Sequence, residues 1–582
     1  MPLPFMCLCA VFFLCFPHQA TSSPSPSPSS SSSSAAGANT SLLVVSFSSD
    51  GSAAYLGRNA LPPSTTSTTT KSSHITNRLT PHPAGLPAPV DFFGDHSQQP
   101  QALAVAISKG VALALTNGGT ALYSWTTPKN SSEAALGRPI SSQQGQGAPA
   151  NRPGQIQLKH SERFTMVAAG LDHAVALSDD GTLYTWGGNE YHQLARPSSR
   201  TDHCRAGPNC TDPSVQVAET SRTFTHVDAG PFYGVAALKK PHRGAVAWGL
   251  TACGVDLPLP DHEKNGRYYV HGFEPARRLG SVVGLERMSI VRVAAGGRHS
   301  AFLTEDGRLF TCATGFDELG NAVTERLPGS VPPTQVPSLT KLNHYGELGR
   351  DDEHISKPMD IGPVDSVLST QTRFKDIALG KCYSLAVDTD GTLWSWGCQG
   401  ALLRTCDVLH PGARSVSKLR SRVDEYASFV YKGDSVSKGD PHKLWKMEKA
   451  YAETRADLEE RAGAWRQCLR HPRPVPWKHL IGRARQAGDA VSLLAAGATT
   501  AAAILKSNEL LVWGRHEETW GGVNGTHSSN VPMSAVNLSK RARKQVKGAG
   551  IWTDAKPLHL AAGEETFLYV VETKLPSPSP SL

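Results

Sequence analysis

The sequence predicts an all-β fold, a seven-bladed β-propeller in which strands from both termini complete one blade. Three observations support this prediction. A unit of three short strands recurs along the 582-residue chain, its period is about 60 residues, and one copy is divided between the two ends. Repeats of this length are typical of propellers and solenoids. The divided copy favours the propeller, because pairing the terminal strands closes the ring and removes open sheet edges.

The clearest copy of the unit reads VAAGLDHAVALSDDGTLYTWGGNEYHQL. Its first apolar run ends at Gly170, and His173–Leu177 then alternates in the manner of a half-buried strand. Asp180-Gly181 predicts a tight hairpin of type I′, a turn in which both central residues need positive φ. Thr182–Trp186 returns as a third strand, and Gly187 ends it.

Alignment on the glycine that follows the first strand recovers the other copies. Five further copies are complete, and the glycine position is held in them by Ser108, Gly230, Gly296, Gly380 and Gly497. A last copy, at Gly563, lacks the hairpin and the third strand. The missing half is found in SFSSDGSAAYLGRN, which predicts that the strand Ala53–Leu56 shares a blade with Leu558–Val571. Successive glycine positions are 62, 60, 66, 84, 117 and 66 residues apart, so insertions interrupt the period twice.

Two repeated positions and the composition argue against catalysis. One offset holds His173 and His299, and in the other copies it holds Val111, Tyr233, Tyr383, Thr500 and Thr566. A position that alternates among His, Tyr, Thr and Val is expected to be a packing slot and not a general base. A second offset is a predicted core slot, with Trp in five copies and Cys312 or Leu56 in the others. No hydrolase, zinc-protease or phosphate-loop motif stands in a credible context, so we expect no enzyme, cofactor or metal.

Glycine and proline contribute 53 and 41 residues, as a chain with many turns requires. The net charge of +8 is modest for this length. It indicates a mild preference for acidic partners and not a dedicated nucleic-acid surface.

Taken together, these motifs resemble the regulator-of-chromosome-condensation repeat family. The resemblance covers most of 41–572 and rests on G-x-x-H at Gly170 and Gly296, the D-G hairpins, the W-G pairs and NHYGELGRDD at 343–352. It implies a seven-bladed propeller closed by terminal strands, and guanine-nucleotide exchange on a small GTPase as one activity. Nuclear exchange factors of this family use a basic chromatin-binding tail. Residues 1–57 contain no Lys or Arg, so chromatin association is not expected.

Residues 1–20 are interpreted as a targeting leader. Phe5–Phe16 has the length of a signal-peptide apolar core and is too short to span a bilayer, which predicts the secretory pathway and no transmembrane span. The lack of Lys and Arg before Arg58 counts against a basic signal-peptide start and against an Arg-rich mitochondrial transit peptide. The mitochondrion is nevertheless the alternative, because single-domain relatives in the family are often mitochondrial. A mis-chosen start codon is a third interpretation. Residues 21–40 and 573–582 are predicted to be a disordered Ser/Pro-rich linker and tail.

Eleven cysteines occur, three of them in the leader. The even remainder suits a secreted protein with disulfides, although a chain of this size does not need them to hold a core. Cys204 and Cys210 share one loop and are the best candidate pair; a metal site with His203 and Asp212 is disfavoured by the spacing. Glycosylation sequons stand in predicted loops at Asn39, Asn130, Asn209, Asn524 and Asn537.

The insertion at 404–490 is predicted to contain one amphipathic helix. Asp440-Pro441 is a strong helix start, and His471-Pro472 ends a run of apolar residues at helical spacing. The helix has about 30 residues and is about 45 Å long. Its apolar stripe includes the candidate partner-binding residues Tyr451, Leu458 and Trp465. The stripe either packs on the propeller flank or forms a partner-binding arm.

A second candidate partner-binding segment is SKRARKQVKGAG at 539–550. It contains no acidic residue and carries five positive charges, Lys540, Arg541, Arg543, Lys544 and Lys547. Such a run is typical of a nuclear-localisation or phosphate-contacting patch, and a solvated loop is the alternative.

These observations predict a non-catalytic propeller scaffold that binds protein partners through loops and the helical insertion. Two alternatives remain open. Guanine-nucleotide exchange on a small GTPase rests on the family resemblance alone. Organellar RNA or ribosome assembly receives limited support from the basic segment at 539–550.

Overall fold

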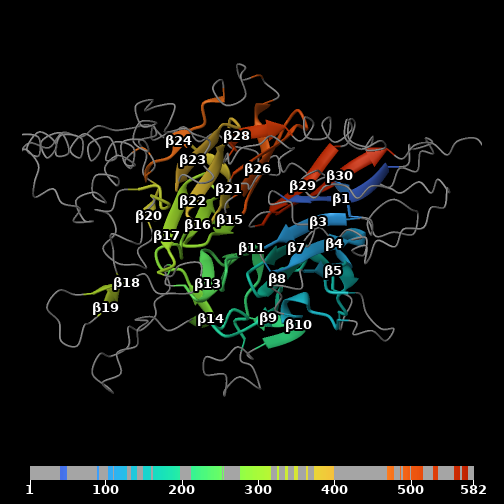
Figure 1. Cartoon of the computed structure of the whole chain (residues 1–582). Coiled ribbons are helices and arrows are strands. Elements are labelled where there is room, and N and C mark those ends of the chain that lie inside the picture. Colours follow the sequence, from blue (N-terminus) through green and yellow to red (C-terminus); the bar gives the residue numbers. More distant parts are fainter. Residues whose placement is uncertain are drawn as a thin grey trace, which may run out of the picture. The chain divides into compact units, whose positions relative to one another are not determined.

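The described residues form an all-β β-propeller with seven four-stranded antiparallel sheets (Figure 1). The computed structural model describes the chain from residue 40 to residue 574 with gaps. The described residues are 40–48, 88–90, 102–108, 110–126, 133–140, 149–158, 162–196, 211–219, 221–251, 253, 276–315, 324–326, 335–337, 346–350, 362–364, 372–398, 468, 470–477, 486, 489–498, 500–514, 529–534, 556–563 and 566–574. The predicted leader, residues 21–39 of the predicted linker and the sequons lie outside them. The predicted disordered boundaries were wrong by one and two residues, because Thr40 and the pair Thr573 and Lys574 belong to paired strands.

We call the sheets blades 1 to 7. Blade 1 contains β3 (Ala102–Ile107), β4 (Ala112–Thr116), β5 (Ala121–Trp125) and β6 (Gly154–Gln155). Blade 2 contains β7 (Phe164–Ala169), β8 (His173–Ser178), β9 (Leu183–Gly188) and β10 (Thr211–Glu219). Blade 3 contains β11 (Phe224–Ala229), β12 (Tyr233–Leu238), β13 (Ala245–Gly249) and β14 (Ala276–Ser281). Blade 4 contains β15 (Ile290–Ala295), β16 (His299–Thr304), β17 (Leu309–Ala313) and β20 (Gly362–Pro363).

Blade 5 contains β21 (Phe374–Leu379), β22 (Tyr383–Asp388), β23 (Leu393–Gly397) and β24 (Arg473–Pro474). Blade 6 contains β25 (Val491–Ala496), β26 (Thr500–Leu505), β27 (Leu510–Gly514) and β28 (Ser529–Ser534). Blade 7 contains β29 (Lys556–Ala562), β30 (Thr566–Lys574), β1 (Thr40–Ser48) and β2 (Ala88–Pro89). Smaller elements are the separate hairpin of β18 (Thr324–Arg326) and β19 (Gln335–Pro337) and the 3-10 turns η1 (Asn117–Gly119) and η2 (Glu133–Leu136).

The blades close into a ring through the terminal strands. The first strand of each blade contacts the next blade, and β29 of blade 7 contacts β3 of blade 1. β1 pairs with β30 from Thr40↔Lys574 to Ser48↔Thr566, beside each other in Figure 1. The divided repeat is therefore real.

The choice of N-terminal strand was wrong in the sequence prediction. The edge of β30 is occupied by Thr40–Ser48 and not by Ala53–Leu56, which lies outside the described residues. The reason lies in the residues. TSLLVVSFS contains the strand formers Thr40, Val44, Val45 and Phe47 in an otherwise uncharged run, and Val44 and Ser46 are buried. The D-G motif at Asp50-Gly51 attracted the prediction to a shorter run downstream.

The D-G hairpins also differ from the predicted turn. In blade 2 the backbone N–H of Ser178 donates to the oxygen of Thr182, and only Gly181 of the turn residues has positive φ, at 95°. A type I′ turn needs two such residues, so this is a longer loop of the kind in which a glycine follows a type I turn. Gly307 and Gly391 repeat the geometry at φ values of 81° and 80°. Asp180 accepts bonds from Ser178 and Thr182, which stabilises the turn without a positive φ of its own.

The core lies between the blades. All six residues of β8 are buried, where the sequence predicted a half-buried strand. The reason is that blades stack face to face, so a middle strand is covered on both sides. The Trp slot is confirmed as core, because the five indoles are at most 1 % exposed. They are Trp125, Trp186, Trp248, Trp396 and Trp513.

Candidate functional site

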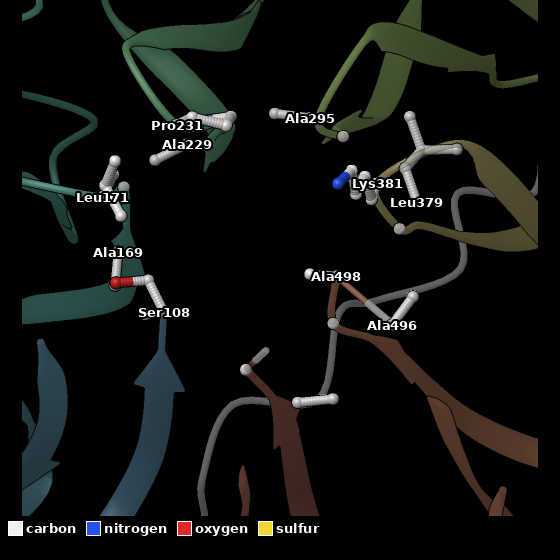
Figure 2. Close-up of a pocket in the computed structure, with 18 of the residues that line it drawn as sticks. Ser108, Ala169, Leu171, Ala229, Pro231, Ala295, Leu379, Lys381, Ala496 and Ala498 are labelled. Carbon is white, nitrogen blue, oxygen red and sulfur yellow. The ribbon is translucent and has the colours of Figure 1, made fainter. Parts of the chain in front are cut away.

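A cavity of about 370 Å³ lies where the first strands of the blades end (Figure 2). Its lining comes from all seven blades and includes the repeat-defining glycines. The glycines are required because neighbouring blades approach closely here: a Cβ on Gly170 would lie 2.8 Å from the oxygen of Gly230, and one on Gly296 would lie 2.7 Å from the oxygen of Gly380. A Cβ on Gly170 would also overlap the ring of His173 in its own blade, so the residue used to align the repeats leaves room both for that ring and for the neighbouring blade. We call this end of the propeller the mouth.

Hydrogen bonds between blades stiffen the rim of this cavity. The backbone N–H of Leu171 donates to Pro231 at 3.0 Å, that of Gly297 to Gly380 at 3.0 Å, and that of Lys381 to Ala498 at 3.2 Å. The cavity is therefore lined mainly by backbone and small side chains that are already fixed.

Lys381 gives the cavity its charge. It is the one charged residue among the described residues of the lining, and its amine reaches into the open space in Figure 2. Ser108 contributes a hydroxyl, and the other labelled side chains are Ala, Leu and Pro. Among the described lining residues, the ammonium group of Lys381 is the one that favours a carboxylate or another small acidic group. Sequence reasoning missed Lys381. The same repeat offset holds Lys109 in the first copy, and in the others it holds Leu171, Pro231, Gly297, Ala498 and Glu564.

The histidine slot is confirmed as structural and has a further role. Tyr233 of blade 3 donates to the backbone oxygens of Gly296 at 3.0 Å and His299 at 2.9 Å in blade 4. Tyr383 repeats the contact with Gly497 and Thr500 of blade 6, at 2.9 and 2.8 Å. In these two copies the slot residue fastens its blade to the next one.

His299 uses a side-chain partner for the same purpose. Its Nε2 lies 2.7 Å from the hydroxyl of Ser384 in blade 5, and that hydroxyl donates its proton to the oxygen of Glu347. Nε2 of His299 must therefore be the donor to Ser384. Burial lowers the pKa of His299 to about 3, so the ring is neutral at physiological pH. A neutral, fully buried ring without access to substrate is not a general base.

A polar cluster lies along the axis, and sequence reasoning missed it. First strands are inner edges of the blades, with backbone N–H groups left without a ladder partner. The preceding blade satisfies three of these groups with side chains: His226 accepts from Val293 at 3.4 Å, Asp228 from Ala295 at 2.9 Å, and His559 from Val105 at 3.4 Å. Arg292 completes the cluster through an ion pair of 2.9 Å with Asp376.

A sequence signal for the cluster did exist. His226, Arg292, Asp376 and His559 each stand four residues before the repeat glycine, in otherwise apolar strands, whereas other copies have Ala104, Met166 and Leu493 there. The described residues contain no group of His, Cys, Asp and Glu suited to a metal ion. The side chains of the cluster instead bind backbone N–H groups of the next blade or form the ion pair between Arg292 and Asp376.

The predicted partner-binding residues Tyr451, Leu458 and Trp465 lie outside the described residues. The described residues on either side show where the segment that contains these three residues joins blade 5. β23 ends beside Cys398, which is bonded to Cys382, the neighbour of Lys381 at the mouth. The segment therefore leaves blade 5 at the mouth. At its far end Cys468 and Arg470 have helical backbone and β24 follows, in agreement with the predicted stop at His471-Pro472.

Part of the predicted insertion belongs to blade 5. β24 lies inside 404–490 and pairs with β23. Cys468, Val475 and Trp477 pack in the core between blades 5 and 6. The separable part is therefore shorter than predicted.

The basic residues Lys540, Arg541, Arg543 and Lys544 also lie outside the described residues. Their segment connects β28 with β29. Ser534 at the end of β28 pairs with Leu511, next to the hairpin of blade 6 at the end opposite the mouth. The two candidate segments therefore start from opposite ends of the blades and do not share one origin.

Comparison with known proteins assigns the repeats. The model of the regulator of chromosome condensation (RCC1) repeat matches residues 165–193, 290–312 and, in a second form, 180–237. These ranges coincide with the copies at Gly170, Gly230 and Gly296. The chain contains RCC1 repeats. The match at 180–237 runs from β9 of blade 2 to β12 of blade 3, so the sequence repeat of this RCC1-repeat protein is offset from its structural blade.

Curated relatives share modest identity with this RCC1-repeat protein. The protein pim1 of Schizosaccharomyces pombe is 27% identical over 300 residues, 50% of this chain and 46% of the relative. The guanine nucleotide exchange factor SRM1 of Saccharomyces cerevisiae is 23% identical over 325 residues, 55% of this chain and 57% of the relative. The chain thus spans about half the length of the curated relatives it matches.

Solved structures support the fold. Human WBSCR16 superposes with a TM-score of 0.54 at 13% identity, covering 92% of this chain and 100% of that one. Yeast Prp20p, a structure described with its binding properties to Gsp1p and histones, gives a TM-score of 0.52 at 15% identity and covers 92% of both chains. At such identities the likeness concerns the propeller alone. Within the described part of the chain, no helix has the length and apolar character to cross a membrane.

Proposed function

We propose that this RCC1-repeat protein is a non-catalytic, seven-bladed scaffold that binds a protein partner at the mouth. The cavity around Lys381 is the observation that carries the proposal. Its rim is fixed by bonds between blades, and the predicted helical segment leaves blade 5 beside it at Cys398. A fixed surface that presents the ammonium group of Lys381 recognises an acidic side chain of a partner better than it performs a chemical step.

Charge reversal tests this proposal. Lys381→Glu is expected to weaken capture of the partner by at least about tenfold, since it places like charges at the contact. The matched control is Lys506→Glu, an exposed lysine in the hairpin of blade 6 at the opposite end. Partners are first captured with the full chain, and their affinity for both variants is then measured with purified proteins. Equal affinities for the two variants overturn the mouth as the binding surface.

Guanine-nucleotide exchange on a small GTPase is the second candidate. The relative SRM1, described as a guanine nucleotide exchange factor, supports it. An exchange factor performs no covalent step, so this activity is compatible with the absence of a predicted catalytic site. Release of labelled GDP from small GTPases of the same compartment decides the matter. Acceleration by nanomolar protein favours exchange, and unchanged release favours the scaffold.

The compartment is part of the proposal. We place the protein in the secretory pathway, and the two cysteine pairs Cys253–Cys312 and Cys382–Cys398 support this, since disulfides persist in oxidising compartments. The mitochondrion is the alternative, and with it a role in organellar RNA or ribosome assembly. Imaging of a C-terminally tagged chain separates the two.

A further inference from the structure

Neighbouring blades are joined by a recurrent hydrogen bond from the Trp slot. The indole N–H of Trp186 donates to the oxygen of Ala135 in the preceding blade at 3.0 Å. Trp248 donates to Gln193 at 2.7 Å, and Trp396 donates to Glu347 at 3.0 Å. Each acceptor belongs to the loop by which the preceding blade leaves its third strand, which we call the exit loop.

The exit loops that accept an indole share a local sequence. It is Leu, then Gly or Ala, then Arg, and it reads Leu136-Gly137-Arg138, Leu194-Ala195-Arg196 and Leu348-Gly349-Arg350. The middle residue makes room for the ring. A Cβ on Gly137 would lie 2.8 Å from Nε1 of Trp186, and one on Gly349 would lie 2.8 Å from Nε1 of Trp396.

Backbone anchors repeat in these loops as well. A hydroxyl of the third strand donates to the leucine oxygen in each case, from Ser124 at 2.6 Å, Thr185 at 2.8 Å and Thr311 at 2.6 Å. The motif in one blade and the indole in the next thus form one recurrent contact that joins neighbouring blades.

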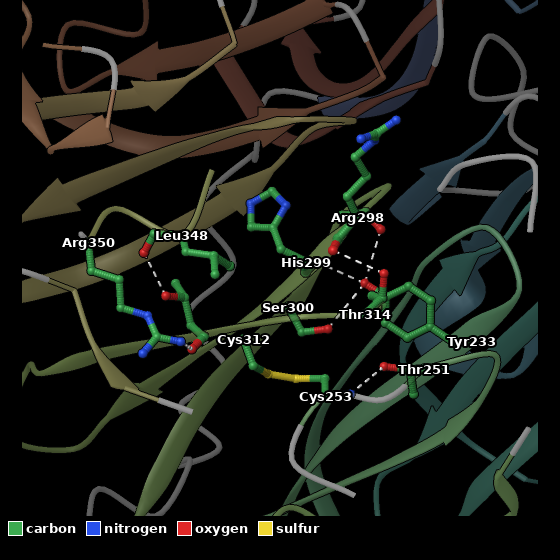
Figure 3. Close-up of a disulfide and its surroundings, with 12 residues drawn as sticks. Tyr233, Thr251, Cys253, Arg298, His299, Ser300, Cys312, Thr314, Leu348 and Arg350 are labelled. Atoms are coloured by element: carbon green, nitrogen blue, oxygen red, sulfur yellow. Dashed lines mark hydrogen bonds between the residues drawn. A yellow bond between two sulfur atoms is a disulfide. The ribbon is translucent and has the colours of Figure 1, made fainter. Parts of the chain in front are cut away.

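At the seam between blades 3 and 4 both halves are replaced. The exit loop of blade 3 reads LTACGVD and lacks the Leu-Gly-Arg motif, and Cys312 stands in the Trp slot of blade 4. Cys253 of that loop is bonded to Cys312, with a Cα–Cα distance of 5.3 Å and neither residue exposed (Figure 3). The backbone N–H of Cys253 donates to the hydroxyl of Thr251 at 3.1 Å, which fixes the loop.

We infer that Cys253 and Cys312 form an inter-blade cross-linking site, which replaces the indole hydrogen bond found at three other seams and makes the seam between blades 3 and 4 depend on oxidation. In the forward step the two thiols lose two electrons and two protons to an oxidising disulfide, which becomes a dithiol. A dithiol reductant reverses the step and is itself oxidised to a disulfide. After reduction this seam has neither a disulfide nor an indole hydrogen bond, because the exit loop of blade 3 lacks the Leu-Gly-Arg motif and blade 4 has no Trp in the slot.

The second described pair is a natural control. Cys382 and Cys398 belong to one blade, are 16 residues apart and are both partly exposed. The backbone N–H of Cys398 already donates to the oxygen of Cys382 at 2.8 Å, so the blade keeps this contact after reduction. We expect dithiothreitol to reduce Cys382–Cys398 first and Cys253–Cys312 later, since burial limits access to the second pair.

Amide hydrogen exchange reports the seam directly. The N–H groups of Val293 and Ala295 in β15 are held by His226 and Asp228 across this seam. The N–H of Val105 in β3 is held by His559 across the seam between blades 7 and 1. When the seam between blades 3 and 4 loosens, exchange in β15 should rise by about tenfold or more while β3 stays unchanged.

The experiment uses the full chain, before and after complete reduction, with the Cys312→Ser and Cys382→Ser variants. We expect the β15 peptide to exchange faster in reduced wild type and in Cys312→Ser, and at the oxidised wild-type rate in Cys382→Ser. If Cys312→Ser does not fold, the comparison of oxidised and reduced wild type decides alone. The inference is overturned if β15 exchange is the same in both states, or if thiol mapping of the oxidised protein finds Cys253 and Cys312 free.

Discussion

Single side chains complete the hydrogen bonding that each blade leaves open at its inner edge. Tyr233 and Tyr383 bind two carbonyl oxygens each in the following blade, and His226 and Asp228 accept backbone N–H groups that have no strand beside them. Buried polar groups cost free energy when they lack a partner. We therefore expect each of these side chains to contribute to the free energy of unfolding.

Removal of the Tyr233 hydroxyl tests this at one residue. Tyr233→Phe leaves the oxygens of Gly296 and His299 without this donor, and we expect the free energy of unfolding to fall by about 1–3 kcal/mol. Tyr184→Phe is the control, because its hydroxyl is partly exposed and makes one contact of 3.3 Å with Glu162. Denaturant unfolding of both variants measures the difference. Equal losses would mean that the bonds of Tyr233 to blade 4 add nothing specific.

The axial cluster predicts a pH dependence of stability. Burial, followed by the charge of Arg292, lowers the pKa of His226 to about 3 and that of His559 to about 4. Both groups therefore contribute stability above pH 6.5, their ordinary pKa, that is lost as the pH falls toward 4 and 3. Burial raises the pKa of Asp228 to about 6, so Asp228 acts in the opposite direction as the pH falls from 6 to 3.8. Burial also raises the pKa of Asp376, the ion-pair partner of Arg292, so two aspartates oppose the two histidines. Removal of one histidine and removal of one aspartate should therefore change the pH dependence of stability in opposite directions.

Variants separate the contributions to this pH dependence. His226→Gln keeps an acceptor without a titrating ring and should make the slope shallower by about one proton. Asp228→Asn removes the opposing group and should make the slope steeper. Unfolding in guanidinium at pH 6.5, 5.5 and 4.5 measures both. Parallel curves for wild type and the two variants would contradict the assigned shifts.

At the scale of elements, the exit loops differ most between blades. The exit loops of blades 1, 2 and 4 carry the Leu-Gly-Arg motif or its Leu-Ala-Arg form and hold an indole, whereas the loop of blade 5 carries the long segment with the predicted helix. Closing a longer loop costs little, about 0.6 kcal/mol for each doubling, so the segment is tolerated without being needed for the fold. The structure fixes its limit at Cys468, which is disulfide-bonded and packs in the core.

Excision of the segment tests its role. A Gly/Ser bridge in place of 440–466 should leave a soluble propeller that unfolds cooperatively and no longer binds its principal partner. Extension of the deletion to residue 472 is the control, because it removes Cys468 and the buried His471 and should lower the melting temperature. Joint replacement of Tyr451, Leu458 and Trp465 by Ser should also abolish binding at an unchanged melting temperature. Aggregation of that triple variant would assign the stripe to core packing instead.

At the scale of the whole molecule, closure joins the ends of the chain. Blade 7 takes β29 and β30 from the C-terminal end and β1 and β2 from the N-terminal side. Without β1, blade 7 loses its third strand and β30 becomes an open edge. Stability of the ring therefore depends on contacts between segments more than 500 residues apart.

Two deletions of similar length test closure. Removal of 40–48 should cost several kcal/mol, because nine strand pairs with β30 are lost. Removal of 49–60 should leave the strand pairs of blade 7 in place and change stability much less. Thermal unfolding of both chains gives the comparison. An unchanged melting temperature after removal of 40–48 would refute closure through β1.

The sequence by itself determined the repeat, its period, its division between the termini and the packing nature of the Trp and histidine slots. Each of these follows from local spacing, which every copy of the unit displays again. Only the tertiary structure decided that β1 is Thr40–Ser48, that Cys253 meets Cys312, that Lys381 enters the cavity and that His226 and Asp228 serve the edge of the next blade. These features are contacts between blades or between the two ends of the chain. The local propensity of a strand carries no information about which distant segment will lie beside it. The packing of the blades around one axis determines that pairing.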